Sequence, residues 1–368
     1  MDKTFSGEIT LLKALAIMLV VSGHLEFSIF GMFPPYSFQL SLFFFISGML
    51  FKDKYLDDVS TYFARRIKSL LLPYFGYEVV YLLITLALVP VVGEFLGDSI
   101  SLKSFFLTPF LNGHQLLLCC PLWFVPQLFM TLIVFLFFMR MLRNVNNKFV
   151  ELGFFTILGV VAIPFWKFIP HHTPLALVVM RTMFSLFFVY LGHYYVRYIK
   201  DNHNIFTTNW LGAIILLQSI LWLFNRDFDP VHGIGLSFVL VWGRFDQQII
   251  VPILTSLTGI WISLFAVKIL YPYLKDVKLL QNMGKVTYHI MANHLLVMYL
   301  ITLVLFHITG IPLSAKGDKI YSIFNPKQTT YLYFVVVMLF TTYLGVFQQF
   351  VWKSLSTVIS TKLQRKDT

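Results

Sequence analysis

Apolar residues along this chain fall into ten long runs, and the shorter stretches between the runs hold most of the charged residues. A helix needs about 20 predominantly apolar residues to cross the hydrocarbon core of a bilayer. Each run is therefore a candidate transmembrane helix, although the second and seventh runs are short. The ten runs are 10–30, 36–51, 70–92, 122–142, 149–168, 175–199, 210–224, 249–270, 287–306 and 330–351.

The stretches between the runs are too short to fold as separate domains. The longest are 93–121, 225–248 and 307–329, whereas an independent domain needs roughly 50 residues. The pattern predicts an all-α integral membrane protein of about ten transmembrane helices, with residues 1–368 forming a single membrane domain.

The composition agrees with this pattern. Of the 368 residues, 58% are hydrophobic and only 12% are charged, whereas about a quarter of the residues in soluble proteins are charged. The two cysteines, Cys119 and Cys120, are adjacent, so they form no disulfide framework and lack the spacing of a zinc site. The first run is not followed by a cleavage signal of the signal-peptide type, so we expect it to be retained as a helix.

The basic residues give a net charge of +11, which on its own would suggest a nucleic-acid partner. Their distribution instead follows the rule that cytoplasmic loops of membrane proteins are rich in lysine and arginine. With the N-terminus in the cytoplasm, 19 basic residues fall on the cytoplasmic side and seven on the other. We therefore expect cytoplasmic N- and C-termini and no nucleic acid partner. The seven are Lys103, Lys167, Arg226, Arg244, Lys316, Lys319 and Lys327.

One polar side chain in the first run is the leading candidate for chemistry. His24 follows a strongly apolar stretch, and an imidazole within a bilayer needs a partner or a cavity. Lys13 lies eleven residues earlier, which on an α-helix is about three turns and roughly 16 Å along the axis, on the same face. Glu26 lies roughly 200° around the helix from His24, so it is poorly placed to orient the imidazole. The sequence assigns no orienting partner.

A basic cluster precedes the third run. Residues 52–72 place apolar side chains at helical spacing beside Arg65, Arg66 and Lys68. This predicts a helix along the inner membrane interface, with Pro73 marking the start of the third span. Such cations anchor helices to lipid headgroups. Two guanidinium groups also suit phosphate, because each can donate paired hydrogen bonds to its oxygens, and both interpretations stay open.

Two charged residues within the runs have structural as well as functional explanations. Glu78 needs a cation or water inside a bilayer, and Arg65, Arg66 and Lys13 are its nearest candidate partners. Arg181 could either extend toward the membrane interface or line a polar cavity.

Five further positions carry expectations. Trp123 is expected to anchor the outer membrane interface, and the small pair Ser47-Gly48 to allow close approach of a helix or a ligand. His289 and His294 are five residues apart and hence on different faces of a helix, which argues against a shared metal, and we expect no metal elsewhere. His294 lies at mid-membrane depth and is the second candidate catalytic residue.

Five stretches of the sequence together resemble the membrane-bound acyltransferase family 3, integral membrane proteins that mostly O-acetylate glycans using acyl-CoA. The stretches occur in order and agree with the expected helices. They are LLKALAIMLVVSGH at the start, LFFFISGML in the second run, ARRIKSLLLPYF at the third, PLWFVPQLF at the fourth and LQNMGKVTYHIMANHLL at the ninth.

The resemblance implies roles for individual residues. The family's first helix carries an arginine ten intervening residues before an essential histidine, and Lys13 and His24 occupy those positions. His294 matches a histidine often found in the ninth helix, so His24 and His294 are the implied catalytic residues. The implied acyl-CoA-binding residues are Lys13, Arg65, Arg66 and Lys68.

Two departures from the family's pattern bear on the substrates. Lysine at position 13 keeps the charge of arginine but lacks its planar fork, which weakens the case for two-point phosphate binding there. Gln39-Leu40-Ser41 stands where relatives often have histidine, methionine and proline. If that histidine contacts the acceptor in relatives, the acceptor of this chain differs.

The resemblance implies acyl transfer from a thioester to a hydroxyl. An imidazole can remove the hydroxyl proton or carry the acyl group transiently, and both roles stay open for His24. The expected partners are acetyl-CoA as donor, a cell-surface or lipid-linked glycan as acceptor and the surrounding membrane lipids, in the inner membrane of a bacterium. A glycan transporter or flippase and an inactive membrane scaffold are the alternatives.

Overall fold

The computed structural model describes residues 3–113, 116–145, 147–225, 236–245, 249–311 and 322–364. These ranges are helical and contain no β-strand, only two isolated bridges. Short 3₁₀ turns (Asp53–Leu56, Leu117–Trp123, His203–Ile205, Leu240–Trp242) and π turns (Ile67–Leu71, Tyr195–Ile199) connect or extend the helices. The α-helices are α1 (Lys3–His24), α2 (Gln39–Met49), α3 (Val59–Arg66), α4 (Leu72–Val92), α5 (Leu102–Phe106), α6 (Thr108–Leu111), α7 (Phe124–Leu142), α8 (Lys148–Phe168), α9 (Pro174–Tyr194), α10 (Thr208–Phe224), α11 (Val251–Leu274), α12 (Lys278–Lys285), α13 (Thr287–Thr309) and α14 (Pro326–Gln364).

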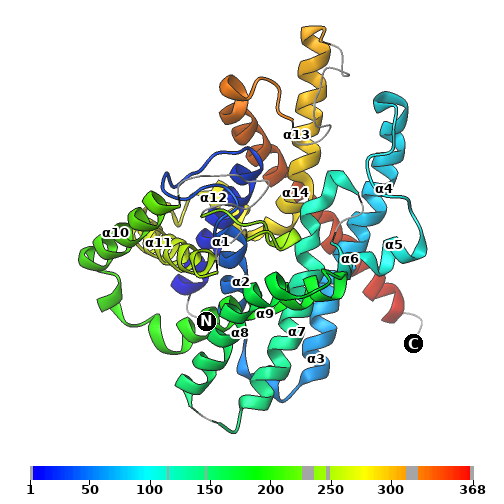
Figure 1. The fold of residues 1–368 in the computed structure, drawn as a ribbon. Coiled ribbons are helices and arrows are strands. Elements are labelled where there is room, and N and C mark those ends of the chain that lie inside the picture. The colour runs from blue at the N-terminus through cyan, green and yellow to red at the C-terminus, as the bar shows by residue number, and fades with distance from the viewer. Residues whose placement is uncertain are drawn as a thin grey trace.

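Every apolar run of the sequence corresponds to a helix, in the expected order (Figure 1). Across the described ranges, eight helical stretches are long and apolar enough to cross a membrane. The two runs that fall short are the second and the seventh, which form α2 and α10. The all-helical membrane architecture is confirmed, and the count of ten spans stays a prediction.

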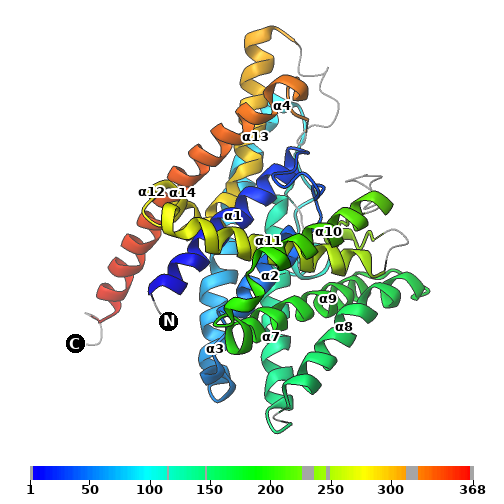
Figure 2. The same cartoon turned by 90° about the vertical axis from the view of Figure 1, so that its left-hand side faces the viewer.

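The two short helices lie in different surroundings. Eight of the 11 residues of α2 are buried, and α2 runs through the interior against α1 and α9, whereas α10 lies at the edge beside α11 (Figures 1 and 2). A side chain at Gly48 would overlap the carbonyl of Val189, and one at Gly192 would overlap that of Phe45. The small pair Ser47-Gly48 therefore serves close helix packing.

The basic segment before the third run is not a separate interfacial helix. A π turn at Ile67–Leu71 joins α3 to α4, so residues 59–92 form one continuous helical stretch. A π turn inserts one extra residue without breaking the helix, and Pro73 is accommodated in the first turn of α4. The separate interfacial helix expected for this segment is therefore wrong, and Pro73 lies at the start of α4.

Several residues assigned to the cytoplasmic side gather at one end of the bundle. Lys200 at the end of α9 lies 5.2 Å from the ring centre of Phe5 in α1. Arg197 Nε lies 3.9 Å from a carboxylate oxygen of Asp53. The direction in which this end faces stays a prediction. The basic residues Arg226, Lys316, Lys319, Arg365 and Lys366 lie outside the described residues.

Candidate active site

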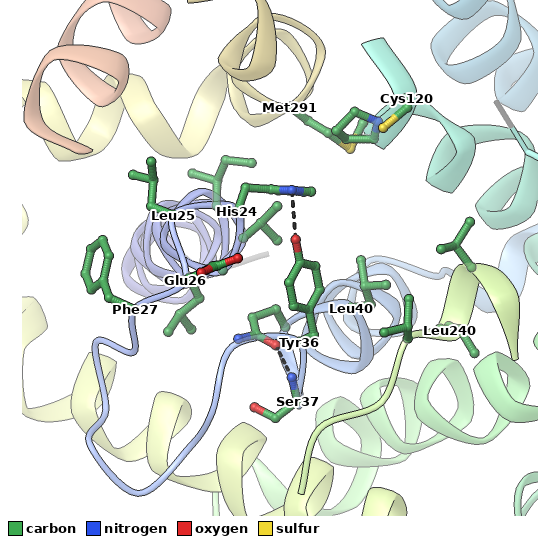
Figure 3. Close-up of a pocket in the computed structure, with 18 of the residues that line it drawn as sticks. His24, Leu25, Glu26, Phe27, Tyr36, Ser37, Leu40, Cys120, Leu240 and Met291 are labelled. Carbon is green, nitrogen blue, oxygen red and sulfur yellow. Dashed lines mark hydrogen bonds between the residues drawn. The ribbon is translucent and has the colours of Figure 1, made fainter. Parts of the chain in front are cut away.

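A cavity of about 880 Å³ lies beside the C-terminal end of α1. Its walls come from α1, the connection 25–38, α2, residues 120–124, residues 238–242, α13 and the segment 322–331, which includes the start of α14. Most of the lining side chains are apolar, and Glu26 and Lys327 are the two carboxylate or ammonium groups among them. The volume is within the range typical of ligand sites. Segments distant in sequence thus meet around His24 (Figure 3).

His24 is the last residue of α1, so the helix ends earlier than the first apolar run predicts. Two residues later Glu26 has a φ of 58°, and Tyr36 further along has a φ of 56°. Non-glycine residues seldom adopt this left-handed conformation, and it concentrates at functional sites. The imidazole therefore lies at a helix end facing a cavity, and not in the middle of a membrane span.

Tyr36 is the orienting partner that the sequence did not assign. Its hydroxyl lies 3.0 Å from Nδ1 of His24, and the two rings meet edge to face, with centres 5.5 Å apart (Figure 3). The backbone N–H of Phe238 donates to the carbonyl of Tyr36 over 2.8 Å, which holds this irregular segment in place. No periodicity relates Tyr36 to His24, so the sequence pattern held no signal for the contact.

His294 of α13 lies beside His24, but it is fully buried and is not among the residues that line the cavity. The ring centres are 5.0 Å apart, with the planes inclined by 47°. Nδ1 of His294 lies 3.1 Å from the carbonyl of Ile290, and because a carbonyl only accepts, Nδ1 carries the proton. Nε2 of the neutral ring is then an acceptor, and this buried nitrogen has no hydrogen-bond partner among the described residues.

His289 and Gln39 are two further polar residues near His24 and His294, and only Gln39 lines the cavity. His289 faces away from His294, with its Nδ1 2.7 Å from the Tyr77 hydroxyl. In the part of the chain that the structure describes, no group of three or more residues of ligand type is placed to hold a metal ion. Gln39, at the position where relatives often carry histidine, lines the cavity, and its side-chain oxygen accepts the N–H of Ser37 over 2.8 Å.

The four candidate acyl-CoA-binding residues do not line this cavity. Lys13 lies on α1 as expected, and it makes no hydrogen bond or ion pair with any residue in the described ranges. Arg65 donates to the Tyr55 hydroxyl over 3.0 Å. The guanidinium of Arg66 lies 4.7 Å from the ring centre of Tyr62, and the side chain of Lys68 is exposed. The structure brings the two histidines together and leaves these cations apart from them.

Among the residues that the structure describes, Glu78 pairs with no cation, contrary to expectation. It is buried, and the thiol of Cys119 donates to it, with Sγ 3.8 Å from Oε1. Arg65 and Arg66 are occupied by tyrosine rings instead. The neighbouring Cys120 faces the other way and lines the cavity with His24.

Trp123 is not an interfacial anchor, because its side chain is only 8% exposed and lines the cavity. Arg181 neither reaches the interface nor lines the cavity. It is 1% exposed and lies over the Trp123 ring, 5.1 Å from its centre. The two residues, which the sequence treats separately, form one buried contact.

Comparison with known proteins identifies one family. A model of the acyltransferase family 3, described as an acyltransferase domain, matches residues 6–347, which include every residue that lines the cavity. No curated protein and no solved structure matches the sequence.

Proposed function

The chain belongs to acyltransferase family 3, and from that premise we propose that it transfers an acetyl group from cytosolic acetyl-CoA to a hydroxyl of a cell-surface or lipid-linked glycan. The observation that carries the proposal is the cavity in which His24 has Tyr36 at one ring nitrogen and His294 beside its ring. An imidazole held by such a partner has a fixed orientation, which general base catalysis requires.

In the proposed reaction, His24 accepts the proton of the acceptor hydroxyl as the oxygen attacks the carbonyl carbon of the thioester. The carbon–oxygen bond forms, the carbon–sulfur bond breaks, and the departing CoA sulfur takes up the proton. The reaction is therefore neutral in protons overall. A positioned base of this kind contributes typically 10²–10⁴-fold to a rate. In a second route, His24 first takes the acetyl group from CoA and then passes it to the hydroxyl.

We assign the phosphates of CoA to Lys13, Arg65, Arg66 and Lys68. Support comes from their lack of carboxylate partners at ion-pair distance in the described ranges, which leaves their charges available to an anion. Lys13 lies about three turns from His24 along α1. The long arm of CoA could then bridge the distance from the phosphates to the imidazole. The inner membrane of a bacterium is the proposed location.

Purified protein supplied with radiolabelled acetyl-CoA tests the proposal. Octyl glycosides of glucose, galactose and N-acetylglucosamine serve as model acceptors, alongside a lipid extract from cells. We expect label to enter a glycoside or a glycolipid as an ester that mild alkali removes. A protein that moves labelled glycolipid across a liposome membrane while transferring no acetyl group would instead be a flippase.

A further inference from the structure

Arg181 is a buried cation whose charge is compensated by carbonyl groups. Its side chain is 1% exposed, and no carboxylate in the described part of the chain lies within ion-pair distance. Nη1 donates to the carbonyl of Leu111 over 3.2 Å, and Nη2 donates to the carbonyls of Asn112, at 3.3 Å, and Val241. A buried charge is tolerated only when such groups surround it.

These carbonyls belong to two connections far apart in sequence. Leu111 and Asn112 end α6, and Val241 lies in a turn in which Val239 and Arg244 exchange two backbone hydrogen bonds. Gly243 in that turn has a φ of 63°, and a side chain there would approach the Trp166 indole nitrogen of α8 to 2.5 Å. Arg181 in α9 thereby fastens both connections to the helical bundle.

Trp123 is a second cavity residue that Arg181 contacts, in addition to Val241. The Arg181 guanidinium lies 5.1 Å from its ring centre, a distance at which a cation attracts an aromatic face. A Cβ at Gly113 would lie 2.9 Å from Trp123 Cβ, so the backbone also closes on the indole. Trp123 and Val241 both line the cavity, and the buried arginine therefore sets the shape of one cavity wall.

The same wall is connected to the proposed base. Phe238, which precedes the turn, donates its N–H to the carbonyl of Tyr36 over 2.8 Å. The hydroxyl of Ser237 donates to the carbonyl of Pro35 over 3.3 Å. Tyr36 in turn contacts His24 Nδ1. Residues 237–241 thus connect the wall held by Arg181, through the backbone, to the segment that carries the partner of the imidazole.

We propose that Arg181 is a positioning residue for the acceptor, which acts by fixing Trp123 as the surface on which an acceptor sugar ring stacks next to His24. An aromatic ring presents an apolar face to the C–H groups of a sugar and leaves the sugar hydroxyls free to react. The indole of Trp242 also lines the cavity and offers a second such face. This inference rests on the proposed function and assigns this side of the cavity to the glycan.

Steady-state kinetics with octyl β-D-glucoside and radiolabelled acetyl-CoA test the proposal. Arg181→Met should raise the KM for the glucoside at least about tenfold, equivalent to about 1.4 kcal/mol, and change the KM for acetyl-CoA by less than about twofold. Arg181→Lys keeps a donor for the carbonyls and should restore part of the acceptor affinity. Trp123→Leu, which leaves the arginine in place, should likewise raise the KM for the glucoside and leave the KM for acetyl-CoA nearly unchanged.

Arg197→Met is the matched control. Arg197 lies further along the same helical stretch, and its guanidinium also lies over an aromatic ring, 5.4 Å from the centre of Tyr198. This variant should leave the KM for the glucoside unchanged. Equal changes in both constants for Arg181→Met, or no change in folded protein, would overturn the proposal.

A second measurement is independent of acyl transfer. In a Cys119→Ala background, Cys120 reports on the wall, because it lines the cavity three residues before Trp123. Arg181→Met should accelerate modification of Cys120 by a methanethiosulfonate reagent several-fold, and Arg197→Met should not. An unchanged rate would reject the positioning role. An accelerated rate in a protein whose wild type acetylates no glycan would support that role and reject the proposed function alone.

Discussion

Two regions carry the two halves of the proposed chemistry, and the protein organises them differently. The histidine half consists of His24, Tyr36 and His294. The cationic half consists of Lys13, Arg65, Arg66 and Lys68, with Tyr55 beside Arg65. At the C-terminal end of α1, His24 has Tyr36 at its Nδ1 and His294 beside it, and it lines a cavity whose walls come from seven parts of the chain. Lys13, in the middle of α1, has no hydrogen-bond or ion-pair partner in the described ranges, and Arg65 and Arg66 of α3 contact tyrosine rings.

The difference follows from what each half must do. A base needs a fixed direction toward the atom that it deprotonates, so partners on both sides of an imidazole are useful. A cation that receives a phosphate needs donors that no carboxylate already occupies. We infer that the histidine half is assembled before any substrate binds, whereas the cationic half is completed by the donor itself.

The largest expected effect comes from removing the imidazole. His24→Ala should lower the rate of acetyl transfer at least about a hundredfold, because a base or nucleophile typically contributes that much or more. His171→Ala, which removes an exposed histidine from a loop, is the control and should leave the rate unchanged. Appreciable transfer by folded His24→Ala protein would move the chemistry to another residue, with His294 the first to test.

A change of about tenfold in acetyl-CoA binding is expected for a variant in the cationic half. If Lys13 binds a CoA phosphate, Lys13→Gln should weaken acetyl-CoA binding roughly tenfold or more, since a hydrogen bond to a charged group is worth about 1.5–3 kcal/mol. Lys13→Arg should keep or strengthen the binding. The measurement is a titration of acetyl-CoA against purified protein whose membrane insertion has been checked. An unaltered donor constant would leave Arg65 and Arg66 to hold the phosphates.

A smaller effect is expected for the partner of the imidazole. Tyr36→Phe keeps the ring but removes the hydroxyl that contacts His24 Nδ1, and a neutral hydrogen bond is worth about 0.5–1.5 kcal/mol. The turnover rate should fall roughly two- to tenfold, while the donor constant stays unchanged. Tyr55→Phe, which removes a hydroxyl from the cationic half, should affect the donor constant more than the turnover rate. If Tyr36→Phe changed mainly the donor constant and Tyr55→Phe mainly the turnover rate, the division between the two halves would be contradicted.

No loss of activity is expected from the variants that test orientation. In a background that lacks Cys119 and Cys120, a cysteine at Ser60 should be protected from an impermeant thiol reagent in intact cells. A cysteine at Ser99, in the stretch between the third and fourth runs, should be labelled. Ser314, also predicted to lie outside, falls beyond the described residues. Labelling at Ser60 would place the cationic half on the wrong side for a cytosolic donor.

The helices and the two histidines were predictable because their signals are local. Ten apolar runs predict ten helices from composition alone, and α2 and α10 differ only in that they are too short to be assigned as spans. His24 and His294 stand out because an ionisable side chain within an apolar run requires a cavity or a partner. Their contact is consistent with that requirement, although nothing in the pattern indicates the distance between the two rings.

Contacts set by distant segments were not predictable in the same way. The helix end at His24 depends on the left-handed conformation of Glu26, which composition does not reveal. The burial of Trp123 depends on Arg181, which lies 58 positions further along. Glu78 lies against Cys119 and not against a cation, because α4 presents it to the Leu117–Trp123 turn. Each of these features depends on how helices and connections that are distant in sequence pack together.

The central claim is that the cavity around His24 acetylates a glycan, and the surface glycans of the cell test it most directly. Mass spectrometry would compare cells without this protein, cells that express it and cells that express His24→Ala at the same level in the membrane. We predict one acetyl mass on a surface or lipid-linked glycan in the second sample and its absence from the first and third. The same acetylated glycan in cells that carry only His24→Ala would contradict the account.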